Sequence, residues 1–271
     1  ELAVFQYGDG DGIPVLLIHG VTSSNRAFQL FADALIARGT APFAVDLRGR
    51  GDSNSLQGPF GMRQHAADMS AVIDHFGWNK VDVIGHSMGG ASLLMAAHSE
   101  PHLFKALFVF EPIVFPPPDP DAGERPGSPL PAGARKRRSR FPSFEAAIEN
   151  FAAKPPMAAF NAVAREAYVR HGFKPTADGD IELKCLPEHE ARTYETGGTS
   201  GAWDSLPLIT TPVWVLSGAI APFQPSTFAI TVAERIPAST YVRWDEVGHF
   251  GPLEKPELIA QYVTSVVATL P

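Results

Sequence analysis

The chain alternates short apolar runs with segments whose apolar residues recur at helical spacing. The apolar runs predict strands at residues 2–7, 14–18, 43–45, 81–84, 107–110, 213–216 and 241–244. Helical spacing predicts a helix that begins at the cap Ser24 and ends at Gly39, and further helices at residues 62–76, 91–98, 228–235 and from 257 onward. Alternating strands and helices predict an α/β fold, with a mostly parallel central sheet and helices on both faces.

The alternation stops between residues 112 and 203. Prolines crowd the first part of this segment and predict irregular structure there: Pro116, Pro117, Pro118, Pro120, Pro126, Pro129 and Pro131. Helical spacing returns at residues 144–151 and 158–168. We therefore expect a core made of residues 1–111 and 204–271, and an inserted lid, residues 112–203, over the carboxyl edge of the sheet.

Charge and composition narrow the function classes. The 271 residues carry 22 Lys and Arg against 29 Asp and Glu, and a net charge of −7 disfavours nucleic acid as a partner. Five basic residues nevertheless gather in the insertion: Arg135, Lys136, Arg137, Arg138 and Arg140. Such a block usually lies in solvent, so we expect a solvated lid surface, with an anionic partner as the alternative interpretation.

Redox chemistry and membrane insertion are also disfavoured. Cys185 is the single cysteine, which rules out an internal disulfide and a thiolate-based zinc or redox site. No apolar run reaches the length of a membrane span, and no basic-then-apolar leader opens the chain. We expect a cytoplasmic protein, with a leader removed from before Glu1 as the alternative. The sequence does not indicate an oligomeric state.

A G-x-S-x-G pattern stands between a predicted strand and a predicted helix, at Gly85-His86-Ser87-Met88-Gly89. In this context the pattern predicts a sharp turn, a nucleophile elbow, that projects the Ser87 hydroxyl above the sheet. The alternative is a glycine-rich turn with an incidental serine. The strand before it and the helix after it favour the nucleophile.

A serine nucleophile needs a base, and His249 is the histidine that best fits. It follows the predicted strand at residues 241–244, where a loop at the carboxyl edge of the sheet brings it toward Ser87. Other histidines lie on predicted helices, at their ends or in the lid: His65, His75, His98, His102, His171 and His189. We therefore predict that His249 is the general base.

Two turns after strands are candidate binding loops. The turn at His19-Gly20-Val21 is expected to aim the Val21 N–H at the same point as the Met88 N–H, and two such donors form an oxyanion hole. His19 itself is expected to stabilise the turn. The segment DLRGRGDS at residues 46–53 resembles a phosphate loop but lacks the Gly-Lys-Ser/Thr ending, so we interpret it as a structural turn.

The chain resembles the α/β-hydrolase family, in its lidded esterase and lactonase branch, at HG (residues 19–20), DLRGRGDS (46–53), GHSMGG (85–90) and VGHF (247–250). The resemblance implies the fold predicted above and a Ser-His-acid triad. Serine at the elbow is unlike the aspartate that haloalkane dehalogenases and epoxide hydrolases of this fold use.

The chain departs from the family pattern at the usual position of the triad acid. Such proteins usually carry an aspartate in the loop after the strand at residues 213–216, and Ala221 occupies that place here. Glu111 is the first candidate, because it ends the neighbouring strand at residues 107–110 and some members take their acid from that position. A solvated glutamate at the root of the lid is the alternative for Glu111. Weaker candidates for the acid are Asp204, Asp245 and Glu246.

These observations predict a serine hydrolase without metal or cofactor that cleaves a small carboxylic ester or lactone. Aromatic residues in or near the lid suggest a partly apolar substrate: Phe115, Phe141, Phe151, Phe160 and Trp203. The same side chains equally suit a lid core. The alternatives are a carbon–carbon bond hydrolase or an acyltransferase on the same triad, and a ligand-binding protein of the same fold without turnover.

Overall fold

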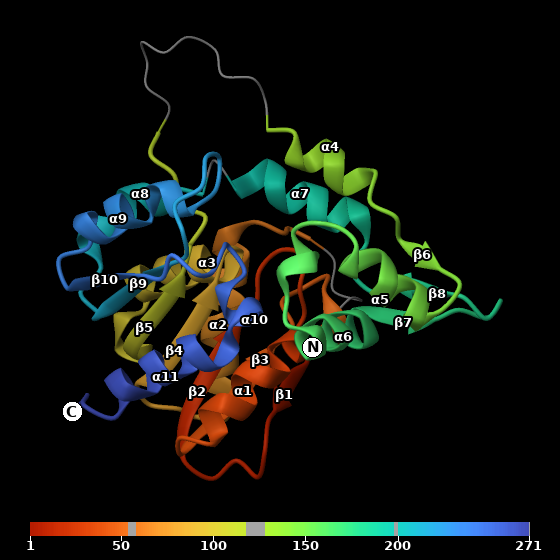
Figure 1. Cartoon of the computed structure of the whole chain (residues 1–271). Coiled ribbons are helices and arrows are strands. Elements are labelled where there is room, and N and C mark those ends of the chain that lie inside the picture. The colour runs from red at the N-terminus through yellow and green to blue at the C-terminus, as the bar shows by residue number, and fades with distance from the viewer. Residues whose placement is uncertain (54–57, 118–127, 198–199, 271) are drawn as a thin grey trace.

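A seven-stranded sheet in the order β1-β3-β2-β4-β5-β9-β10 forms the centre of the protein (Figure 1). The computed structural model describes residues 1–53, 58–117, 128–197 and 200–270. All neighbouring strands are parallel except β1, which runs antiparallel to β3. The strands are β1 (Val4–Gln6), β2 (Ile13–Ile18), β3 (Thr40–Val45), β4 (Val81–His86), β5 (Phe104–Phe110), β9 (Val213–Ser217) and β10 (Ser239–Arg243).

Helices cover both faces of the sheet, as predicted. On one face lie α1 (Gln29–Ile36) and α11 (Pro256–Val267), and on the other lie α2 (Met62–Phe76), α3 (Met88–Ser99) and α9 (Ser226–Arg235). Alternate residues of β2 divide between the two apolar clusters, with Leu16 in one and Leu17 in the other. A strand buried on both faces explains why its sequence is a continuous apolar run.

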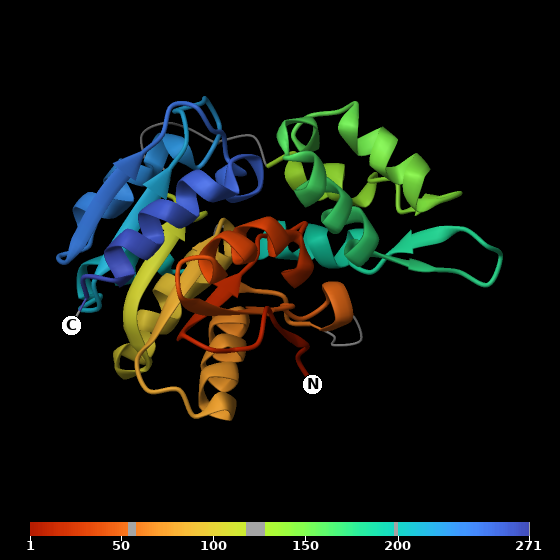
Figure 2. The same cartoon turned by 60° about the horizontal axis from the view of Figure 1, so that its bottom comes forward.

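Residues 130–197, within the segment predicted as an insertion, gather beside this sheet in both views (Figures 1 and 2). This part contains a small antiparallel sheet in the order β6-β8-β7 and four α-helices. Its elements are α4 (Leu130–Arg135), β6 (Arg140–Phe141), α5 (Phe144–Ala152), α6 (Ala162–Gly172), β7 (Phe173–Pro175), β8 (Ile181–Leu183) and α7 (Pro187–Gly197). Its role as a lid stays a prediction.

Short helices complete the described chain. Two α-helical turns are α8 (Ala202–Ser205) and α10 (Gly251–Glu254). The 3₁₀ turns are η1 (Asn25–Phe28), η2 (Gly51–Ser53), η3 (Pro101–Leu103), η4 (Met157–Ala159) and η5 (Leu206–Leu208). No helix in the described ranges is long and apolar enough to span a membrane.

The predicted core strands are all present, and α2 has the predicted bounds. Two local expectations were wrong. Ser24 is the N-cap residue of the 3₁₀ turn η1, which precedes α1, but its side chain makes no capping hydrogen bond. Pro131 does not prevent regular structure but lies in the first turn of α4, where a helix has no N–H bond to lose.

The small sheet was not predicted, because strands of two or three residues are too short to show alternation. The helix expected at residues 158–168 is α6, which begins four residues later, after the 3₁₀ turn η4. Of the prolines that predicted irregular structure, Pro118, Pro120 and Pro126 lie outside the described residues.

Candidate active site

Ser87 lies in the sharp turn that joins β4 to α3. Its backbone has φ +56° and ψ −115°, a left-handed conformation that is strained for a residue with a side chain. Close packing on both sides requires the glycines: a Cβ on Gly85 would lie 2.8 Å from the Gly90 backbone, and one on Gly89 would lie 2.5 Å from the Ile18 carbonyl oxygen. The turn thus has the shape that the motif predicts.

The imidazole of His249 lies between Ser87 and Glu111. Its Nε2 is 3.2 Å from Ser87 Oγ, and its Nδ1 is 2.7 Å from Glu111 Oε2. His249 comes from the loop between β10 and α10, and the two partners come from the ends of β4 and β5. The structure therefore brings together the three side chains that the sequence selected, with the imidazole between the hydroxyl and the carboxylate.

Glu111 is completely buried and has a positive φ of 43°. Its Oε1 accepts a hydrogen bond of 2.9 Å from the Gly218 N–H, and its own N–H donates to the Leu216 carbonyl at 2.9 Å. A buried carboxylate needs such partners, and His249 and Gly218 supply them. The weaker candidates are exposed in the structure: Asp204, Asp245 and Glu246.

Two residues fix the loop that carries His249, and sequence analysis assigned neither of them a role. Glu254, at the end of α10, accepts the Gly248 N–H at 2.7 Å and the Phe250 N–H at 3.2 Å. The Nε2–H of His86 donates to the His249 carbonyl at 2.8 Å. Burial, together with the neighbouring His249, lowers the pKa of His86 to about 3, so this donor is a neutral imidazole. The contacts of Glu254 had one sequence signal, which is that this acid follows His249 by only five residues.

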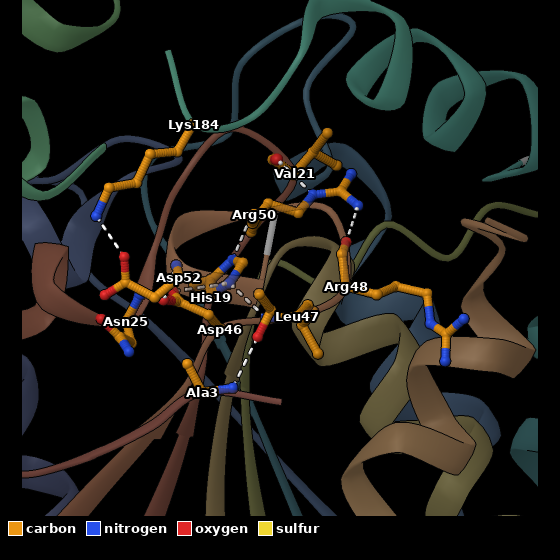
Figure 3. A network of polar contacts seen from close by, with 12 residues as sticks. Ala3, His19, Val21, Asn25, Asp46, Leu47, Arg48, Arg50, Asp52 and Lys184 are labelled. Carbon is orange, nitrogen blue, oxygen red and sulfur yellow. Dashed lines mark hydrogen bonds and ion pairs between the residues drawn. The ribbon is translucent and has the colours of Figure 1, made fainter. Parts of the chain in front are cut away.

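The turn after β2 is held by His19. The buried His19 ring accepts the Leu47 N–H at Nε2, 3.0 Å, and its Nδ1–H donates to the Gly20 carbonyl at 2.7 Å (Figure 3). Burial lowers the pKa of His19 to about 3, and a neutral ring suits this one-donor, one-acceptor arrangement. Behind the turn, the Nε–H of the fully buried Arg50 donates to the Val21 carbonyl at 3.2 Å (Figure 3).

Of the two predicted oxyanion donors, one borders the cavity that Ser87 lines and the other follows Ser87 in the chain. Val21 lines the same cavity as the Ser87 side chain, and Met88, which follows Ser87 directly, is the first residue of α3. The first N–H groups of a helix have no partner within the helix, which leaves the Met88 N–H available. That both groups bind an oxyanion stays a prediction.

The segment at residues 46–53 makes its contacts within the protein. Asp46 accepts the N–H of Asn25 at 2.7 Å and that of Asp52 at 2.8 Å, and burial raises its pKa to about 6 (Figure 3). Arg48 forms a two-pronged ion pair with Asp68, with both N–O distances 2.6 Å. These contacts are those of a structural turn.

The basic cluster of the insertion is matched by acidic groups. Arg135 binds Glu188 and Glu195, and Arg140 binds Asp178 and Asp180. The expectation of a solvated surface was wrong for Arg137, whose side chain is only 13% exposed. The carboxylate of Glu190 on α7 lies 2.8 Å away and offsets the cost of burying this charge.

A cavity of about 1200 Å³ lies against Ser87 and His249. Its walls come from the core and from the insertion, and most of the side chains are apolar, among them Val21, Ile113, Phe115, Met157, Tyr194 and Phe250. Of the aromatic residues expected to meet the substrate, Phe115 lines the cavity, whereas Phe141, Phe151 and Phe160 are buried in an apolar cluster that the insertion shares with the core. Trp203 packs against the core. Among the described residues, no group of three or more His, Cys, Asp or Glu is placed to hold a metal ion.

Comparisons with known proteins agree with this fold. Residues 15–262 match the sequence profile described as the alpha/beta hydrolase family. A soluble epoxide hydrolase of a Corynebacterium species is 36% identical over 104 residues, which are 38% of this chain and 36% of that protein. The lipase LipV of Mycobacterium tuberculosis is 34% identical over 114 residues, 42% of either chain. The matches thus span less than half the length of these curated relatives.

A solved structure extends the likeness to nearly the whole chain. The crystal structure of E-2-(acetamidomethylene)succinate hydrolase has a TM-score of 0.82 at 21% sequence identity, and the alignment covers 99% of this chain and 95% of that one. At this identity the likeness establishes the fold. The family profile covers most of the chain, including Ser87, Glu111 and His249, and the protein belongs to the α/β-hydrolase family.

Proposed function

We propose that this member of the family is a serine hydrolase that cleaves a carboxylic ester or lactone. The observation that carries the proposal is the sequence of contacts from Ser87 Oγ to His249 Nε2, 3.2 Å, and from His249 Nδ1 to Glu111 Oε2, 2.7 Å. Nucleophilic catalysis requires a base within reach of the serine and a third group that orients the base. The contacts meet both requirements.

The proposed reaction has two halves. Ser87 Oγ attacks the substrate carbonyl carbon while His249 Nε2 takes the hydroxyl proton, and the Val21 and Met88 N–H groups bind the resulting oxyanion. The carbon–oxygen bond to the alcohol then breaks, and the alcohol leaves with the proton from His249. Water repeats the attack on the acyl-enzyme, and the carboxylic acid leaves Ser87. Throughout, Glu111 keeps the Nδ1–H tautomer of His249 and stabilises the imidazolium.

The alternatives use the same cavity. A ligand-binding protein without turnover was suggested by Ala221, but the contact of Glu111 with His249 removes the main reason for that interpretation. A carbon–carbon bond hydrolase and an acyltransferase use the same three residues. Product analysis with a diketone and an ester of matched size, with and without added alcohol, distinguishes them.

A fluorophosphonate probe tests the proposal directly. Mass spectrometry is expected to locate the adduct on Ser87, and Ser87→Ala is expected to lose both the adduct and p-nitrophenyl ester turnover. Ser23 is the matched control, because it lines the same cavity and its hydroxyl has no hydrogen-bond partner among the described residues. Ser23→Ala should keep both labelling and turnover, and an adduct elsewhere, or turnover by Ser87→Ala, would refute the proposal.

A further inference from the structure

The cavity wall contains charged side chains that the proposed mechanism does not use. Glu190, Glu195 and Glu254 are acidic, and Arg137 is the one arginine or lysine among the described residues that line the cavity. The acids therefore outnumber the cation by three to one. Charges beside a reacting centre influence which substrates can approach it. The selection therefore depends on whether each charged group is already paired within the protein.

Arg137 is already neutralised. Its Nη1 lies 2.8 Å from Glu190 Oε2, and its Nη2 donates to the Tyr168 hydroxyl. The Arg137 and Glu190 side chains are 13% and 5% exposed, so the pair lies in a low-dielectric region where its mutual attraction is strong. Arg137 follows α4 and Glu190 belongs to α7, and the packing of these two helices keeps the pair together (Figure 1).

The other two acids also have partners. Glu254 binds the Gly248 and Phe250 N–H groups, and Glu195 forms a 2.8 Å ion pair with Arg135 at a more exposed position. No positive charge in the described wall is therefore left for a substrate carboxylate. Such a group would lose its hydration inside an apolar cavity and meet a wall with excess negative charge.

We propose that Glu190 is a specificity-determining residue, and that by neutralising Arg137 it makes the cavity select an uncharged, largely apolar ester or lactone over one that carries a carboxylate. This inference rests on the proposed function. It adds the chemical class of the substrate, and it assigns the selection to one ion pair in the insertion.

Two esters of the same shape test the selection. The p-nitrophenyl esters of 4-methylpentanoic acid and of succinic acid differ in one terminal group, isopropyl against carboxylate. The wild-type protein is expected to favour the neutral ester in kcat/KM by about 10²-fold or more, because the carboxylate is desolvated without a partner. Equal rates, or faster turnover of the succinyl ester, would overturn the inference, whereas turnover of neither ester would refute the proposed function instead.

Glu190→Gln tests the assigned residue. It leaves the Arg137 charge free to bind the substrate carboxylate, so the preference should fall by about tenfold or more, through a gain on the succinyl ester. The matched control is Glu188→Gln, on the same helix and also paired with an arginine but outside the cavity wall, which should leave the preference unchanged. An unchanged preference in folded Glu190→Gln would overturn the assignment.

A double variant keeps the test decisive if the unpaired Arg137 prevents folding. Arg137→Gln with Glu190→Gln removes both charges, and its preference should stay within about threefold of the wild-type value, because the native pair is already neutral. A change of about tenfold or more in this variant would overturn the inference.

Discussion

The backbone N–H of Gly218 donates a hydrogen bond of 2.9 Å to Oε1 of Glu111. Glu111 follows β5 and Gly218 follows β9, and these two strands are parallel neighbours. The other carboxylate oxygen of Glu111 lies 2.7 Å from His249 Nδ1. The end of β9 thus orients a carboxylate that comes from the neighbouring strand, and the proposed mechanism assigns the role of the triad acid to this carboxylate.

Glu111→Gln should lower kcat by about 10³ to 10⁴ while the protein stays folded. The amide oxygen can still accept the Gly218 N–H, but the amide cannot stabilise a positive imidazolium or fix its tautomer. Steady-state kinetics with a p-nitrophenyl ester, together with thermal unfolding, provide the measurement. The exposed Glu246 is the control, and Glu246→Gln should have near-normal kcat. A near-normal kcat in Glu111→Gln would mean that another group orients His249.

Val21 contributes its backbone N–H in the proposed mechanism, so the side chain should matter little. Val21→Ala should change kcat only mildly, whereas Val21→Pro removes the N–H and should lower kcat by about 10² to 10³. Circular dichroism first verifies that both variants fold, and steady-state kinetics then compare their kcat values. Similar losses in the two variants would indicate that Val21 acts through packing.

Glu254 holds the peptide groups on both sides of His249, and a neutral amide offers a single acceptor oxygen for the two N–H donors. Glu254→Gln should therefore loosen the imidazole and lower kcat by about 10- to 10²-fold, with KM changed by less than about threefold. The exposed Glu257 in the first turn of α11 is the control, and Glu257→Gln should retain wild-type kcat. A loss confined to KM would show that Glu254 contacts the substrate instead.

Asp82 should make stability depend on pH. It is buried in β4, neither carboxylate oxygen has a partner among the described residues, and burial raises its pKa to about 6 although Lys105 opposes the shift. Because the folded pKa exceeds the unfolded value, the folded state binds more protons between these two values. Stability is therefore lost as pH rises toward 6, and the loss is complete above it.

Asp82→Asn removes the buried charge that lowers stability above pH 6. The Tm of this variant at pH 8 should therefore exceed the wild-type Tm by about 2 to 4 °C. The difference should shrink below pH 6 and vanish below about pH 3, where the aspartate is protonated in both states. Thermal unfolding at several pH values measures it, with the exposed Asp74→Asn as the control. A difference independent of pH would contradict the titration of Asp82.

The sequence by itself determined the features that depend on neighbouring residues. An apolar strand, Gly85-x-Ser87-x-Gly89 and a helix specify the turn at Ser87, because a Cβ on Gly85 would meet the backbone of the nearby Gly90. Helical spacing over residues 62–76 predicted α2 with its observed bounds, and the helix ends at Gly77, whose positive φ is typical of a helix end. Short 3₁₀ turns and two-residue strands left no comparable pattern.

The tertiary structure decided which charged groups meet. The sequence reduced the acid to a few carboxylates, with Glu111 first, but the 2.7 Å contact with His249 joins residues 138 positions apart and depends on the order of the strands. Arg137 lies in a basic run that is typical of solvated surface, yet it is buried against Glu190, 53 positions later. The energy of a charged group depends on its burial and on its distance to the opposite charge, and both quantities exist only once the chain has folded.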